Sequence, residues 1–155
     1  MDTQALELKI PPLVVVAVMA LAMWIAAKQM PTLSVTFAGR AWLAWTALAL
    51  ALATLIAGVH AFSKARTTVD PRHPESSNAV VANGVYRFTR NPMYLGMLLA
   101  LLSWALFLSN IAAVVFLPLF VLFINRFQIR PEERALTAKF GDAYRSYLRS
   151  VRRWL

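Results

Sequence analysis

The chain has 155 residues, of which 59% are hydrophobic and 15% charged, and it contains no cysteine. Without cysteine it can form neither disulfides nor thiolate metal sites, and its charged fraction is well below the roughly 25% of soluble globular domains. The formal net charge of +9 is compatible with a nucleic-acid partner, but the charges lie in two blocks between apolar runs, a pattern typical of a membrane protein with basic cytoplasmic segments.

Two apolar runs, 11–29 and 41–62, occupy the first part of the chain. Each is close to the roughly 20 residues that a helix needs to cross a bilayer core. The first begins with two prolines, which suit the first turn of a helix. The second carries Trp42 and Trp45 near one end, where indole rings favour the membrane interface. The N-terminus lacks a basic n-region, so we expect the first run to be a retained span rather than a cleaved signal peptide.

The segment 63–91 is polar and interrupts the apolar pattern. Its turn-forming dipeptides are Asp70-Pro71, His73-Pro74 and Asn83-Gly84. A connection of nearly thirty residues usually signals function or disorder. We therefore predict an ordered polar loop with a functional role.

Two further apolar runs, 92–108 and 111–129, follow the loop. Only Ser109 and Asn110 separate them, which predicts a tight antiparallel hairpin. One continuous helix across both runs is the alternative. Pro118 is expected to kink the fourth helix, because proline removes a backbone N–H and clashes with the preceding turn.

The tail 130–155 is polar and basic. Pro131 followed by Glu132 and Glu133 predicts the start of a helix, since acids are favourable in a first turn. Spacings of three and four place several apolar side chains on one face, namely Leu136, Phe140, Tyr144, Tyr147 and Val151. We predict an amphipathic helix on the cytoplasmic surface, or two short helices interrupted at Gly141-Asp142.

These elements predict one all-α integral membrane domain, 1–155, with four transmembrane helices and a cytoplasmic amphipathic C-terminal helix. The loop 63–91 carries five Lys and Arg and the segment 126–155 carries eight, whereas only Lys28 and Arg40 lie near the opposite side. The positive-inside rule then places the loop, the tail and both termini in the cytoplasm. We expect the protein in the bacterial inner membrane.

Two polar stretches, 84–96 and 125–133, contain the candidate functional residues. The first enters the third span and the second leaves the fourth. Because a hairpin returns the chain to the side from which it came, both stretches should meet at the cytoplasmic surface. They are therefore predicted to form two walls of one pocket.

The residue types in that pocket suit a particular ligand. The first N–H groups of the helix that begins at Pro92 lack intrahelical partners and can hold a carboxylate. Tyr94 and Phe88 offer aromatic surface for a flat base or a cation. Glu132 and Glu133 can accept hydrogen bonds from ribose hydroxyls or an ammonium group. These groups are suitable for S-adenosylmethionine, although they do not by themselves require it.

The stretch Arg90-Asn91-Pro92-Met93-Tyr94-Leu95-Gly96 resembles the Arg-His-Pro-x-Tyr-x-Gly motif of the isoprenylcysteine carboxyl methyltransferases and the related phospholipid methyltransferases. Residues 131–136, with the Phe-Gly and Tyr residues after them, resemble the C-terminal signature of the same family. The resemblance covers roughly residues 66–155. Asn91 stands where the best-known members have His. Asparagine does not titrate near neutrality, which argues against an acid–base role there and leaves a role in positioning the cofactor.

The resemblance implies a methyltransferase that uses S-adenosylmethionine on a lipophilic substrate from the bilayer. The cofactor contacts that it implies are Val85, Tyr86, Arg90, Asn91, Tyr94, Leu95, Glu132 and Glu133. The candidate catalytic residues are Arg126, Arg130 and Glu133. The two arginines lie one helical turn apart and are candidates for steering an acidic substrate group; they are alternatively membrane anchors that reach the headgroups.

Other functions are also compatible with the sequence. A membrane reductase of the steroid-reductase type would use NADPH, and a non-enzymatic assembly protein would bind anionic lipid through its basic tail. If the methyl acceptor were an amine or hydroxyl, Glu133 or His60 could serve as the base. The two histidines, His60 and His73, are far apart in a chain without cysteine, so we expect no metal site. We expect no nucleic-acid partner, and membrane lipid as a partner.

Overall fold

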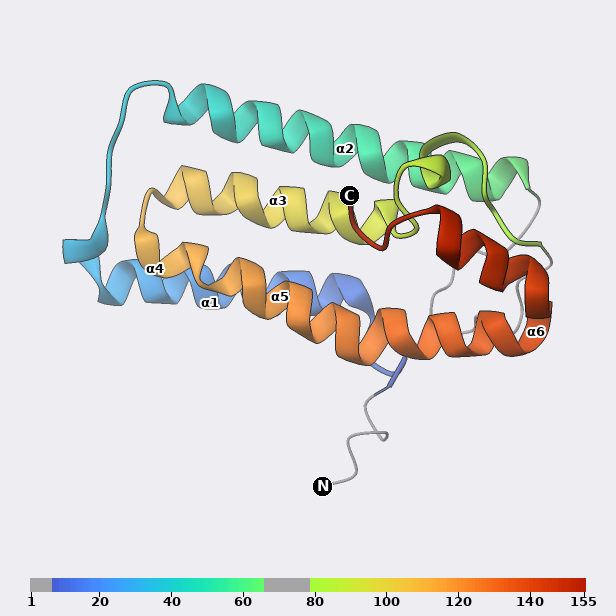
Figure 1. Cartoon of the computed structure of the whole chain (residues 1–155). Coiled ribbons are helices and arrows are strands. Elements are labelled where there is room, and N and C mark those ends of the chain that lie inside the picture. The colour runs from blue at the N-terminus through green and yellow to red at the C-terminus, as the bar shows by residue number, and fades with distance from the viewer. Residues whose placement is uncertain (1–6, 66–78) are drawn as a thin grey trace.

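A computed structural model describes residues 7–65 and 79–155 of the chain. The helices are α1 (Pro12–Gln29), α2 (Arg40–Lys64), α3 (Pro92–Leu108), α4 (Ile111–Val114), α5 (Phe116–Ile124) and α6 (Arg130–Ser150), with 3-10 turns at Pro31–Leu33 and Gly84–Arg87 and a π-helical turn at Asn125–Ile129. The long helices lie side by side as a bundle (Figure 1). Within the described residues the fold is all-helical, and its β-type pairing is one isolated bridge between Ser34 and Asn110.

Three helical runs are long and apolar enough to cross a membrane: α1, α2 and the run Ile111–Ser150, whose apolar part ends where the polar tail begins. The fourth apolar helix, α3, has 17 residues and coincides with the run predicted at 92–108. Large apolar side chains cover the outer surfaces of α1 and α2; Trp42, at 79% exposed, is the most accessible of them. Such an apolar exterior is typical of a protein surrounded by lipid.

The hairpin predicted between α3 and α4 is confirmed. Ser109 ends α3 with a left-handed backbone (φ 51°), and Asn110 caps α4 by accepting a hydrogen bond from the Ala112 N–H at 2.9 Å. The Asn110 amide also donates to the carbonyl of Met30 at 2.8 Å, at the end of α1. This buried asparagine therefore fixes the turn and joins it to the first helix.

The fourth predicted helix is interrupted near Pro118, as expected. α4 ends at Val114 and α5 begins at Phe116, so the break at Val115 lies three residues before the proline. Pro118 has no N–H to donate to the carbonyl of Val114, which accounts for the interruption.

Small residues line the contact between α2 and α3. Ala44, Ala47, Ala51 and Gly58 are the buried residues of α2, and the Ser103 hydroxyl of α3 donates to the Ala44 carbonyl at 2.8 Å. A Cβ added at Gly96 would lie 2.7 Å from Leu55 Cγ and 3.0 Å from the Ala51 oxygen. The two backbones thus approach as closely as small residues allow in membrane helix pairs, and this contact holds the first turns of α3 in place.

The tail bends at Gly141, where the sequence predicted an interruption. Gly141 has φ 55° and ψ −127° inside α6, and beyond it the chain turns back toward the start of α3 (Figure 1). Tyr144 and Tyr147 of the predicted apolar face are buried, and the Tyr147 hydroxyl donates to the Tyr86 carbonyl at 2.8 Å. Part of that face therefore packs against the protein itself. A position of α6 on the membrane surface stays a prediction.

Candidate functional site

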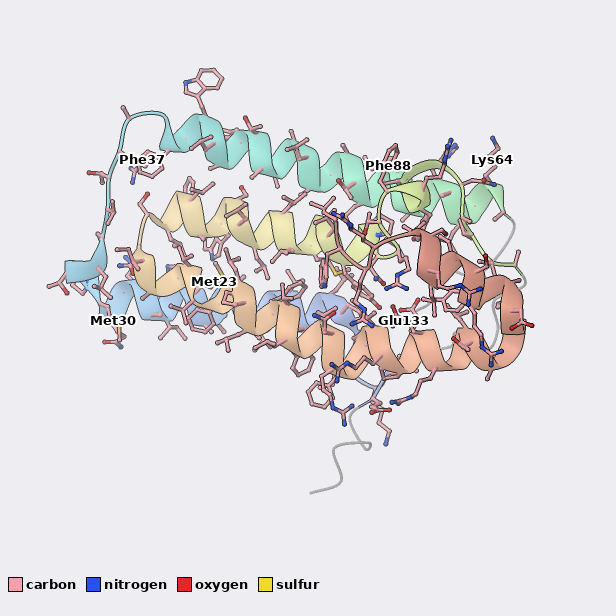
Figure 2. The ribbon with its side chains drawn as sticks, in the orientation of Figure 1. Met23, Met30, Phe37, Lys64, Phe88 and Glu133 are labelled. Carbon is pink, nitrogen blue, oxygen red and sulfur yellow. The ribbon has the colours of Figure 1, made fainter. Side chains whose placement is uncertain are left out.

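The two polar stretches meet at one end of the bundle. The Tyr94 hydroxyl, in the first turn of α3, donates to Glu132 Oε2 at 3.2 Å. The Arg90 guanidinium lies 3.4 Å from Glu133 Oε1. Figure 2 shows Glu133 near the beginning of α6, on the side facing α3. The convergence expected from the hairpin is therefore present, and Glu132 and Glu133, the acid pair, face the start of α3.

Local chain geometry explains why the acid pair occupies this place. The π-helical turn Asn125–Ile129 leads directly into α6, and its Gln128 and Ile129 are buried. Pro131 lies buried in the first turn of α6, and it has no N–H to donate to the π-helical turn before it. The acid pair follows in the same turn.

Glu132 occupies an unusual electrostatic environment. Burial raises the pKa of its carboxyl to about 7, an effect that the Tyr94 hydrogen bond opposes and the negative charge of Glu133 reinforces. Within the described part of the chain, Glu132 has that hydrogen bond and no ion pair. A half-buried carboxyl with one neutral partner suits either a cationic ligand or a proton-transfer role near neutral pH.

The raised pKa of Glu132 predicts how the stability of the ligand-free protein depends on pH. The folded-state pKa lies above the unfolded value of 4.5, so the folded state binds the proton more tightly. Its contribution is complete below about pH 4.5 and is lost as the pH rises through about 7. We expect the thermal midpoint in detergent to fall over this window, because the free energy of unfolding decreases by at most about 3 kcal/mol. Glu132→Gln should flatten this part of the profile; an unchanged profile would contradict the assignment.

The C-terminal segment, residues 151–155, forms a further part of the site that the sequence did not predict. Arg153 contacts both carboxylate oxygens of Glu133, with Nη2–Oε2 at 2.6 Å and Nε–Oε1 at 3.2 Å. The Trp154 indole donates to Asn125 Oδ1 at 3.1 Å. Periodicity could not identify these residues, since α6 ends at Ser150, and no feature of the sequence distinguishes Arg153 from Arg152.

The predicted cofactor contacts differ in how close they lie to the acid pair. Tyr94 and Arg90 contact it directly. Asn91 is buried and donates its side-chain amide to the Arg153 carbonyl at 2.9 Å. Tyr86 is buried beneath Tyr147.

The surroundings of Val85 and Leu95, and of the Phe88 ring that was considered together with Tyr94, differ from those of the polar candidates. Val85 and Leu95 are half-buried, and both take part in backbone hydrogen bonds, from Phe88 N to Val85 O at 3.1 Å and from Leu95 N to Asn91 O at 2.9 Å. The Phe88 side chain is 74% exposed and lies away from Glu133 (Figure 2). The structure therefore does not bring Phe88 to the acid pair.

The two arginines proposed for a substrate role, Arg126 and Arg130, have different surroundings. Arg126 forms an ion pair with Glu7 at 2.6 Å, and Arg134 contacts the second oxygen of Glu7. The hydrogen bond from Arg126 is the main reason that the pKa of Glu7 lies below its usual range. Arg130 instead lines an open depression of about 530 Å³ together with Glu133, Arg134, Thr137, Ala138 and Arg145. Arg130 therefore shares a pocket with Glu133.

One of the two histidines lies within the described residues. His60 is exposed on α2, and His73, with the turns expected at Asp70-Pro71 and His73-Pro74, lies outside the described residues. Among residues 7–65 and 79–155, no group of three or more His, Asp or Glu side chains could hold a metal ion.

Comparison with known proteins identifies the family. The model of the phospholipid methyltransferase family (PEMT) matches residues 39–143, more than half of the chain. The chain belongs to the phospholipid methyltransferase family. The matched region includes α2, the start of α3 and the acid pair. Methyltransferases of this family generally use S-adenosylmethionine. Membership, together with the three apolar helices, indicates an integral membrane methyltransferase.

A smaller protein also resembles this family member. An uncharacterized protein of Haemophilus influenzae is 54% identical to it over 63 residues, which are 41% of this chain and the whole length of the relative. No solved structure matches the chain.

Proposed function

We propose that the protein transfers the methyl group of S-adenosylmethionine to a carboxylate or another heteroatom of a lipophilic substrate, such as an isoprenoid acid. The observation that carries this proposal is the contact between the start of α3 and the acid pair, seen in the Tyr94–Glu132 hydrogen bond at 3.2 Å. This contact joins the two segments in which the sequence resembles methyltransferase motifs. The family membership supports the same reaction class.

The residues at this site fit the charges of the proposed cofactor. Glu132 is a half-buried carboxyl without an ion pair among the described residues, so a sulfonium or ammonium group would supply the countercharge that it lacks. The start of α3 has no side-chain cap, and its first N–H groups suit a carboxylate. We assign Glu132 and the α3 start to cofactor binding, and Tyr94 to orienting Glu132.

The chemistry requires little from the protein beyond positioning. S-adenosylmethionine supplies a methyl group already activated by the sulfonium. An acceptor lone pair forms the new bond to the methyl carbon while the carbon–sulfur electron pair returns to sulfur. A carboxylate acceptor gives an ester and releases no proton. An amine or hydroxyl acceptor would lose a proton, for which Glu132, with its pKa raised to about 7, is better suited than the exposed His60.

The membrane arrangement in this proposal has four spans, with α3 crossing beside α2 and with both termini on the cytoplasmic side of a bacterial inner membrane. The site then lies at the cytoplasmic surface and the substrate reaches it from the bilayer. Arg130, Arg134 and Arg145 line the depression next to Glu133, so an acidic substrate group would find complementary charge there. This environment favours a carboxylate-bearing substrate of the isoprenylcysteine type among the family's substrates.

The proposal is tested by following a labelled methyl group. Purified protein in detergent, incubated with methyl-labelled S-adenosylmethionine and a total lipid extract, is expected to transfer label to an organic-soluble product. S-adenosylhomocysteine should raise the thermal midpoint, because a ligand that binds only the folded state stabilises it. Stabilisation by NADPH alone would support the membrane reductase instead. No labelled product across varied extracts, with no stabilisation by either ligand, would favour the assembly protein.

A further inference from the structure

The C-terminal segment is held along the start of α3 by its own backbone carbonyls. The Arg90 N–H donates to the Arg152 carbonyl at 2.9 Å. The Arg153 carbonyl accepts from the Thr89 hydroxyl at 3.2 Å and from the Asn91 amide at 2.9 Å. Because these bonds involve main-chain oxygens, they fix where the segment runs without depending on its side chains.

The side chain of Arg153 then reaches across to the acid pair. Its guanidinium binds both oxygens of Glu133, at 2.6 Å and 3.2 Å, while Arg90 approaches the same carboxylate from α3. The Glu133 side chain is 15% exposed and that of Arg153 is 32% exposed. A two-point bond between a planar guanidinium and a carboxylate fixes the orientation of the carboxylate, which a single bond does not.

We propose that Arg153 is a positioning residue of the cofactor site, an inference that rests on the proposed function. By holding Glu133 in one orientation, Arg153 fixes the first turn of α6 and with it the neighbouring carboxyl of Glu132. The C-terminal segment lies along the start of α3 and joins it to the first turn of α6 through the Arg153 side chain. Asn91 acts in the same way, because its amide holds the Arg153 carbonyl rather than extending toward the acid pair.

A purely structural clamp is the competing explanation, and matched variants separate the two. Arg153→Gln removes the guanidinium, and Arg153→Lys keeps the charge but not the planar fork. Arg152→Gln makes the same charge change one residue earlier on an exposed side chain, while the Arg152 carbonyl can still accept from Arg90. All three variants alter the basic C-terminal segment by one side chain.

The measurements are the dissociation constant of S-adenosylhomocysteine, KM for S-adenosylmethionine, kcat, and the thermal midpoint without ligand, all on the full chain in detergent. We expect Arg153→Gln to weaken S-adenosylhomocysteine binding on the order of tenfold, the effect of losing a hydrogen bond to a charged group. KM should rise more than kcat falls. Arg153→Lys should recover part of the affinity, and Arg152→Gln should match the wild type.

Each contrary result has a distinct meaning. If Arg153→Gln lowers the ligand-free midpoint but leaves the affinity and KM unchanged, Arg153 is only a structural clamp and the inference is wrong, while wild-type binding still supports the proposed function. If the wild type does not bind S-adenosylhomocysteine, the proposed function fails as well. If Arg153→Gln does not fold, Arg153→Lys provides the test. Wild-type affinity of Arg153→Lys for S-adenosylhomocysteine would show that the two-point contact with Glu133 is not needed, and the inference would be wrong.

Discussion

Replacing Glu133 with glutamine is expected to reduce methyl transfer on the order of 100-fold or more. The carboxylate of Glu133 faces two guanidinium groups, those of Arg153 and Arg90, at 2.6 Å and 3.4 Å. Both cations would keep their positions while losing their countercharge. Removing one partner of such a buried cluster typically costs about 3–5 kcal/mol of folding stability. We expect about 2.7 kcal/mol of it to be lost from the cofactor-bound state as the first turn of α6 shifts, which corresponds to the 100-fold effect. The readout is label transfer from S-adenosylmethionine to lipid.

A matched acid on the same helix provides the control. Asp142 pairs with Arg145 at 2.9 Å, but its side chain is 96% exposed, and exposed ion pairs contribute at most about 1 kcal/mol. Asp142→Asn should therefore keep nearly full activity. The thermal midpoint of Glu133→Gln without ligand shows whether the variant is folded. A folded Glu133→Gln that retains most of its activity would remove the acid pair from the site.

Gly96→Ala is expected to destabilise the protein by about 1–3 kcal/mol, the usual cost of overpacking a close contact. The added Cβ would lie 3.0 Å from the Ala51 carbonyl oxygen and 2.7 Å from Leu55 Cγ. The backbone at Ala51 cannot move aside without separating α2 from α3. Because Tyr94 lies two residues earlier in α3, activity should fall together with stability. Thermal unfolding in detergent and the label-transfer assay measure the two effects.

Gly58 provides the comparison on the partner helix. A Cβ at Gly58 would meet Met93 Cγ at 2.9 Å, and a methionine side chain has several rotatable bonds with which to adjust. We therefore expect Gly58→Ala to cost less than Gly96→Ala. The reverse order would show that side-chain adjustment, rather than the approach to the Ala51 backbone, limits this contact.

Local sequence signals predicted the helices and the hairpin well. Hydrophobic runs are nearly sufficient to locate apolar helices, which is why the run 92–108 coincides with α3. Ser109 and Asn110 predicted the turn, because both residue types favour turns and caps. Gly141 predicted the bend in α6. The meeting of Tyr94 with Glu132 followed from the hairpin, since antiparallel helices return the chain to the same side.

The remaining parts of the site depend on contacts between distant residues. Glu7 pairs with Arg126 across 119 positions, and Arg153 reaches Glu133 only because α6 folds back. No periodicity encodes either contact. The π-helical turn was also not predicted, because its residues read as the continuation of an ordinary apolar helix. The exposed position of Phe88 shows the same limit, since residue type alone does not tell which side of a loop a ring will occupy.

The π-helical turn Asn125–Ile129 sets the rotational phase of everything that follows it. An ordinary α-helix rotates by about 100° per residue, and a π turn accommodates a residue beyond that repeat. Shortening the turn by one position would therefore swing α6 about its axis by roughly a quarter of a revolution, carrying Glu132 away from Tyr94. Inserting or deleting one residue in this turn should therefore reduce activity far more than substituting one residue there, even where no side chain of the turn contacts a ligand.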